Sequence, residues 1–195
     1  MAPCAVSVKG TLLLSRLKYL RSKEQEDVGR VLQRLSADDL AILNGILLPS
    51  SWYPADLVHR LEQAIVEVLA QGDRSELFVD MGRASATMNL TGRGTQRAYV
   101  QLGDPHFVLR YSPHVYASTH STGSRTYQKT GETSALLRTT DDVAEPNAED
   151  CLTTVGWLTR AIELSGGQEA RTIETQCRAR GAAQCEYHCE WRLVV

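Results

Sequence analysis

The chain has 195 residues, of which 43% are hydrophobic and 23% are charged, and its formal net charge at pH 7 is -2. This length fits one domain with a sizeable core and disfavours a multidomain enzyme. The small net charge disfavours a dedicated nucleic-acid-binding protein. No run approaches the roughly 18 apolar residues of a membrane-spanning helix, and no signal peptide is recognisable. We therefore expect a cytoplasmic protein with no membrane span.

The first half of the chain has the patterns of helices. Residues 1–35 are locally basic and are interpreted as an N-terminal helical extension, followed by one domain over residues 36–195. Apolar residues recur at helical spacing from Leu57 to Leu69, directly after Pro54. This stripe predicts an amphipathic helix, because one face of it would be buried.

A further helix is expected over residues 76–90. Between Thr95 and Thr119 we expect only short helical pieces, because Pro105 and Pro113 interrupt the pattern.

The second half alternates strand and helix patterns. Residues 124–130 and 133–140 predict a hairpin, and residues 149–165 predict a helix. Residues 170–195 have strand composition around a turn at residues 180–182, which predicts a second hairpin. The expected fold class is therefore α+β, with N-terminal helices followed by an antiparallel sheet and a helix packed on it.

The cysteines are the one unusual feature of the composition. There are five, and an odd number without a secretory signal disfavours a disulfide framework. Glu174-x2-Cys177-x7-Cys185, together with Cys151 from the preceding helix, supplies three thiolates and one carboxylate. This donor set suits a tetrahedral zinc ion, and four protein ligands leave no open position, so the expected zinc is structural. It would tie the last helix to the C-terminal hairpin.

Two observations keep alternatives open for this motif. Three small buried cysteines also pack well in an ordinary core. Glu174 and Cys177 face opposite sides of a regular strand, so Glu174 reaches the ion only if a bulge or the strand end lies near Gln176. Cys189 is four residues from Cys185, roughly 13 Å along a strand at ~3.3 Å per residue. It is interpreted as a spare thiol, like Cys4.

The C-terminal motif also carries a family resemblance. Cys151-x4-Gly156-Trp157, followed by Glu174-x2-Cys177-x-Ala179-x-Gly181-x3-Cys185, resembles the vinyl-reductase-type (4-vinyl reductase) domain. That group includes the sensor domains of bacterial activators that respond to phenol-like aromatics. Their zinc ligands are three cysteines and a glutamate, which by this resemblance correspond to Cys151, Glu174, Cys177 and Cys185. The match is specific over residues 149–191 and only architectural over about 50–140.

The N-terminal part, with Lys9-Gly10 and Trp52-Tyr53-Pro54, is similar to an uncharacterised family of myxobacterial paralogues. The wider superfamily includes haem nitric-oxide sensors and subunits of a vesicle-tethering complex. The Tyr-x-Ser-x-Arg motif of the haem sensors is not reproduced by Tyr111-Ser112-Pro113-His114. The aromatic sensors hold the phenol with a His and a Trp, and no Trp lies between Trp52 and Trp157. We therefore expect this chain to bind neither haem nor a phenol in the way that those families do.

The resemblance implies a non-enzymatic, zinc-containing sensor or regulatory module that forms a homodimer. It would bind a hydrophobic or aromatic small molecule and act through a separate protein partner. Weak candidates for the ligand site are His106, Tyr111 and Tyr116, which could equally be ordinary packed or exposed side chains. The alternative is a protein–protein interaction subunit without a small-molecule ligand, as in the vesicle-tethering branch. The chain has no nucleophile elbow and no complete dinucleotide motif, which disfavours an enzyme.

Overall fold

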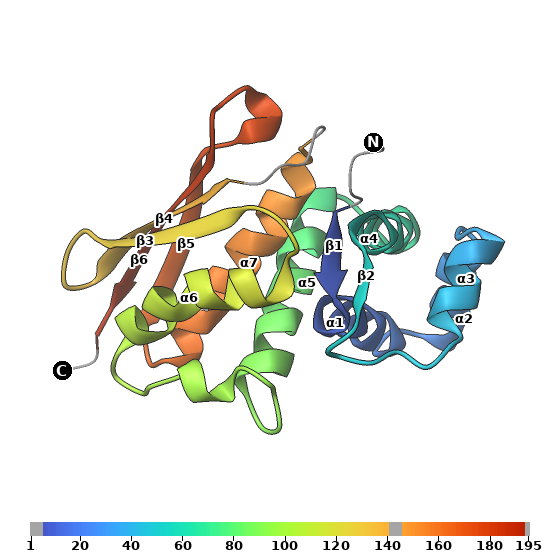
Figure 1. Cartoon of the computed structure of the whole chain (residues 1–195), viewed down its shortest axis with the longest axis horizontal. Coiled ribbons are helices and arrows are strands. Elements are labelled where there is room, and N and C mark those ends of the chain that lie inside the picture. The colour runs from blue at the N-terminus through green and yellow to red at the C-terminus, as the bar shows by residue number, and fades with distance from the viewer. Residues whose placement is uncertain (1–5, 141–145, 194–195) are drawn as a thin grey trace.

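The computed structural model describes residues 6–140 and 146–193, which form a helical half and a sheet half (Figure 1). The elements of the first half are β1 (Ser7–Lys9), α1 (Gly10–Arg21), α2 (Gln25–Leu32), α3 (Ala37–Leu43), β2 (Trp52–Pro54), α4 (Ala55–Leu69) and α5 (Arg74–Leu90). The second half has a 3-10 turn (Arg97–Tyr99), α6 (Pro105–Thr119), β3 (Ser124–Lys129), β4 (Ser134–Thr140), α7 (Ala148–Leu164), β5 (Gln168–Gln176), a 3-10 turn (Arg178–Arg180) and β6 (Cys185–Arg192). The α+β class predicted from the sequence is confirmed.

The larger sheet is antiparallel throughout, with strand order β3-β4-β6-β5. β6 therefore occupies the interior of the sheet, between β4 and β5. Alternate residues of β6 are buried, which is the period expected of a strand with one face on the core. α7 covers this buried face, and α5 runs alongside α7 (Figure 1). A second small sheet pairs β1 with β2.

Two glycines allow the close packing of α5 on α7. A Cβ atom at Gly82 of α5 would overlap the carbonyl oxygen of Thr153, and one at Gly156 of α7 would overlap the carbonyl oxygen of Val79. The two helix backbones are thus in direct contact at this crossing. This contact fixes the distance between the helical half and the sheet half.

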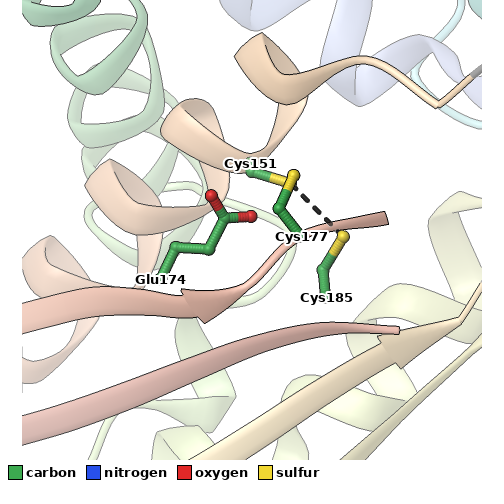
Figure 2. Close-up of side chains that lie close together, drawn as sticks. All are labelled: Cys151, Glu174, Cys177 and Cys185. Carbon is green, nitrogen blue, oxygen red and sulfur yellow. Dashed lines mark hydrogen bonds between the residues drawn. The ribbon is translucent and has the colours of Figure 1, made fainter. Parts of the chain in front are cut away.

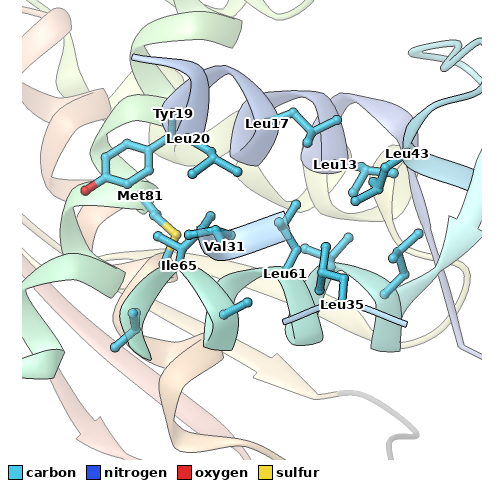
Figure 3. Packing of buried hydrophobic residues seen from close by; sticks show 14 of the residues in the cluster. Leu13, Leu17, Tyr19, Leu20, Val31, Leu35, Leu43, Leu61, Ile65 and Met81 are labelled. Atoms are coloured by element: carbon cyan, nitrogen blue, oxygen red, sulfur yellow. The ribbon is translucent and has the colours of Figure 1, made fainter. Parts of the chain in front are cut away.

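The helical half has its own apolar core, here called the N-terminal cluster (Figure 3). It includes Leu13, Leu17, Leu20, Val31, Leu35, Leu57, Leu61, Ile65, Phe78 and Met81. The predicted stripe of α4 supplies much of it, because Leu57, Leu61 and Ile65 are fully buried. Residues 6–35 contribute α1 and α2 to this same core.

The sheet half has a second core, here called the C-terminal cluster, formed by α7, the inner face of the sheet and parts of α5 and α6. It includes Leu90, Leu109, Leu137, Leu158, Ile162, Tyr187, Trp191 and four of the five cysteines. The N-termini of α6 and α7 are capped by side chains. The Asp104 carboxylate accepts from the Phe107 N–H, and the Asn147 side chain accepts from the Glu149 N–H.

One local expectation was wrong. Residues 105–119 form one helix with Pro113 inside it, rather than short pieces. Proline removes one backbone donor but leaves the rest of the helix intact when packing supports it, and Val108, Leu109 and Val115 are buried. Trp52–Pro54 forms the short strand β2 directly before α4. No helix within the described ranges is long and apolar enough to cross a membrane.

Candidate functional site

Three thiols and one carboxylate converge where α7 meets the ends of β5 and β6 (Figure 2). Cys151 lies in the first turn of α7, Cys177 directly follows β5, and Cys185 begins β6. The Cys151 Sγ lies 3.4 Å from the Cys185 Sγ and 3.8 Å from the Cys177 Sγ. One donor atom from each of these residues and from Glu174 lie within 4.8 Å of one another. The structure therefore brings together all four residues of the sequence motif.

An irregularity in β5 explains how Glu174 faces the thiols. The register between β5 and β6 shifts between Glu174 and Gln176, and β5 ends at Gln176. A regular strand would direct Glu174 and Cys177 to opposite faces. The bulge considered from the sequence is confirmed, and it places both side chains on the α7 side.

The Glu174 carboxylate divides its two oxygens between different environments. Oε2 forms an ion pair with the guanidinium of Arg180. Oε1 is buried and has no hydrogen-bond partner. A buried carboxylate oxygen without a donor is unfavourable, so this atom lacks a positive partner within the cluster.

The surroundings of the cluster favour neutral thiols. The hydrogen bond with Cys185, followed by burial, raises the pKa of the Cys151 thiol far above its ordinary value. Burial and then the neighbouring Glu174 carboxylate raise the pKa of Cys177. Three adjacent thiolates beside a carboxylate would repel one another unless a cation lay between them.

The remaining cysteines lie elsewhere. Cys189 is fully buried in the C-terminal cluster, where the Thr172 hydroxyl lies 3.6 Å from its Sγ. Burial raises the pKa of this thiol to about 12. Cys4 lies outside the described residues.

A cavity of about 230 Å³ separates the helical half from the sheet half. The helical side supplies β1, α1, α4 and α5, and the other side supplies α6, β3, β4, α7 and β6. Cys151 and Cys185 belong both to the thiol cluster and to the wall of the cavity. Most of the exposed lining surface is apolar, and many polar side chains also line the cavity, among them the charged Arg16, Glu62, Arg125 and Asp150. Apolar walls with polar groups between them are found in small-molecule sites.

Two arginines in the cavity wall have different surroundings. Arg16 of α1 forms a buried ion pair with Glu62 of α4. Arg125 of β3 donates from Nε to the Thr139 hydroxyl over 3.0 Å, and its guanidinium lies over the ring of Tyr116. Burial lowers the pKa of Arg125 from its ordinary value.

The three ligand-site candidates from the sequence occupy separate places. Tyr116 lines the cavity, and its ring stacks on His120 with centroids 4.0 Å apart. His106 is buried beneath the β3–β4 turn, where its Nε2 contacts the Glu132 carbonyl at 2.9 Å and its Nδ1 contacts the Tyr127 hydroxyl at 2.8 Å. Tyr111 is 39% exposed and stacks on Tyr99. Only Tyr116 of the three is part of the cavity wall.

Sequence reasoning missed Arg125, Glu62 and His59 as cavity residues. Arg125 lies in a polar strand segment whose composition resembles an exposed edge. Glu62 lies on the face of a predicted helix that was expected to be exposed to solvent. It is only 2% exposed, and its carboxylate pairs with Arg16. His59 lies within metal-binding distance of Glu62 and Asp150, but the Glu62 carboxylate is already paired. No sequence signal distinguishes these residues from their neighbours.

Comparison with known structures defines the class of this fold. It is the fold of H-NOX domains. An H-NOX protein from S. oneidensis, in the Fe(II)NO ligation state, superimposes with a TM-score of 0.68 at 13% identity, over 94% of this chain and 99% of that one. The Tt H-NOX variant F78L gives 0.69 at 14% identity, over 96% of each chain. A structure that probes haem distortion in the H-NOX family gives 0.68 at 13% identity, over 96% of each chain.

The chain belongs to the family described as "Protein of unknown function (DUF2378)", whose sequence model matches residues 28–192. No curated protein matches the chain. The family carries no assigned activity, so function must be argued from the site.

These comparisons correct one expectation from the sequence. A structural zinc was expected as the cofactor, but the group named for the structures of this fold is haem. The motif fixes a set of donors and not an ion, because thiolate-rich sites bind several soft metals. The zinc assignment is therefore withdrawn.

Proposed function

We propose that the chain is a non-enzymatic ligand-sensing module whose ligand binds in the cavity between the two halves. The observation that carries this proposal is the position of the cavity. The helices and strands that form the N-terminal cluster line one side of it, and those that form the C-terminal cluster line the other. A ligand there contacts both halves at once. It can shift their relative arrangement by as much as its affinity differs between two arrangements. The fold shared with H-NOX sensor domains supports the same reading.

Haem does not fit the residues of this cavity. Cavities of about 150 Å³ accommodate benzene, so 230 Å³ has room for one ring with a substituent and not for the four pyrrole rings of a porphyrin. The cavity histidines are also engaged. His120 Nδ1 lies 3.0 Å from the Thr119 hydroxyl, and His59 Nδ1 lies 2.8 Å from the Asn147 amide nitrogen. The ligand of this chain is therefore a smaller hydrophobic or aromatic molecule.

The thiol cluster has a separate role in this proposal, which is to bind a metal ion. Cys151, Cys177, Cys185 and Glu174 would be its ligands, and Glu174 Oε1, which has no hydrogen-bond donor, would face the ion. These four donors would complete the coordination of a four-coordinate ion. Its binding free energy would stabilise the junction of α7 with β5 and β6.

The output of the module would pass through other protein chains. We propose a homodimer that acts on a separate protein partner, as the resemblance to the vinyl-reductase-type sensor domains implies. Size-exclusion chromatography with light scattering tests the dimer, and a mass consistent with a single copy at micromolar concentration would refute it.

Ligand binding is tested by thermal shift with a panel of single-ring compounds. We expect at least one compound to raise the Tm, because a ligand that binds only the native state stabilises it. Val115→Phe should abolish the shift, since Val115 lines the cavity and a larger side chain fills it. Val28→Phe is the matched control, because Val28 packs on the N-terminal cluster outside the cavity. A panel without any Tm shift would refute the sensing proposal.

Metal binding is tested by elemental analysis of the purified chain. We expect about one equivalent of a transition metal, lost in Cys151→Ser and Cys177→Ser. Cys189→Ser is the matched control, because Cys189 is buried but lies outside the cluster. Less than half an equivalent in the wild-type chain, or equal metal in Cys151→Ser, would refute the metal site.

A further inference from the structure

Arg125 is a cation in the cavity wall with no carboxylate partner among the described residues. Its side chain contacts the Thr139 hydroxyl and the face of the Tyr116 ring. The other arginine of the wall, Arg16, is neutralised by Glu62. A guanidinium stays charged at neutral pH, and a charge withdrawn from water is unfavourable unless it is paired. Arg125 thus has the charge and the position to bind an anion inside the cavity.

A second polar group in the cavity wall lacks a partner. The Thr122 hydroxyl is buried without a hydrogen-bond partner, and Thr122 lines the cavity three positions before Arg125. Buried hydroxyls are normally satisfied. A guanidinium and a free hydroxyl together match a carboxylate, which accepts several hydrogen bonds and offers none.

The apolar part of the cavity wall suits a ring. Val8, Val58 and Val115 line it, together with the aromatic side chains of Tyr116 and Tyr187. The volume of about 230 Å³ exceeds the roughly 150 Å³ that accommodates benzene. The difference leaves space for a short polar substituent on the ring.

We propose that the cavity binds a single-ring monocarboxylic acid, with its carboxylate held by Arg125 and Thr122 and its ring among the apolar side chains. The inference rests on the proposed sensing function and specifies the chemical class of its ligand. A doubly charged phosphate is less well matched, because Arg125 supplies the one uncompensated positive charge among the described lining residues.

The test compares benzoate with benzamide, which has the same shape and no charge. Calorimetric titration of the full chain should give an affinity for benzoate about tenfold or more above that for benzamide, as expected for a charge-assisted pair. Arg125→Gln should remove this preference and leave benzamide binding within about threefold. Lys129→Gln is the matched control, because it removes one positive charge from the same strand at an exposed position outside the cavity.

The thermal stability of the ligand-free Arg125→Gln variant gives a second readout. Its Tm should equal or exceed that of the wild-type chain, because the substitution removes an uncompensated cation. A lower Tm with an unchanged preference for benzoate would show that Arg125 only supports the fold and would overturn the inference. Equal binding of benzoate and benzamide by the wild-type chain would overturn it too, while leaving the sensing function intact. If no single-ring compound binds, the inference and the sensing function both fail.

Discussion

The helical half and the sheet half differ in how their buried charged groups are paired. In the helical half, Arg16 is paired with Glu62, and Asp39 accepts two hydrogen bonds from Arg60. In the sheet half, Glu174 keeps one buried oxygen without a partner, and Arg125 has no carboxylate among the described residues. Buried charges are normally paired within the protein. The difference indicates that these charges of the helical half are neutralised within it, whereas the sheet half presents charged groups that suit bound ions or molecules.

The strongest way to break this comparison is to leave a charge unpaired in the helical half. Glu62→Ala should lower the free energy of unfolding by about 3–5 kcal/mol, because it leaves Arg16 buried without its partner. The double variant Arg16→Met/Glu62→Leu should recover most of this loss, since neither charge remains. Urea denaturation measures both. A Glu62→Ala variant as stable as the wild-type chain would show that Arg16 finds water or another partner.

The contact between the two halves should be the next most sensitive feature. Gly156→Ala should cost about 2–3 kcal/mol, because a Cβ there overlaps the Val79 carbonyl and the packed helices must separate. Gly29→Ala in α2 is the control, since no atom lies within 4 Å of its Cβ position. That variant should gain up to about 1 kcal/mol from helix propensity. Equal stability changes in the two variants would refute the close crossing of α5 and α7.

The pH dependence of stability sharpens the comparison in the sheet half. The pKa of Cys189 is raised to about 12 by burial, so the native state retains its proton after the unfolded chain loses one near pH 8.5. The stability from this group is complete below about pH 8.5 and is lost as the pH rises toward 12. Between those limits the loss approaches roughly 1.4 kcal/mol per pH unit. Cys189→Ala should reduce the slope of unfolding free energy against pH by about that amount, and an unchanged slope would contradict the raised pKa.

The smallest effect is expected at the start of α3. The hydrogen bond from Arg60 lowers the pKa of Asp39, so its contribution is present above the unfolded value near 3.9 and is lost as the pH falls through the lower native value. Asp39→Asn should cost about 1 kcal/mol at pH 7, because Arg60 is half exposed and solvent weakens the pair. The cost should shrink below pH 3.5. Asp38→Asn, at the exposed neighbouring position, should change stability by less than half as much.

Particular residues show what the sequence could and could not predict. The apolar spacing of Leu57, Leu61 and Ile65 predicted α4 and its buried face, because that periodicity follows directly from helix geometry. The spacing of Glu174, Cys177 and Cys185 predicted which side chains converge. Because side chains alternate along a regular strand, the spacing of Glu174 and Cys177 also indicated an irregularity near Gln176. The ion could not be predicted, since thiolates accept several metals.

The cavity could not be predicted, because its walls come from segments far apart in the chain. From the sequence, Arg125 is expected to be an exposed strand residue. In the structure its guanidinium lies over the Tyr116 ring. His106 looked like a ligand residue, but its two ring nitrogens contact the β3–β4 turn and Tyr127. Pro113 looked like a helix end, yet the packing of α6 outweighs one missing hydrogen bond.

The spread of the cavity wall along the chain also has a consequence for biosynthesis. Val8 of β1 and Tyr187 of β6 line the same cavity. The cavity therefore forms only after both strands have been synthesised. The helical half precedes the sheet half in the chain and is therefore synthesised first. A small molecule that binds the cavity therefore cannot assist folding before β6 has been synthesised. It can recognise only translation products that extend through β6, so ligand binding requires that this strand has been synthesised.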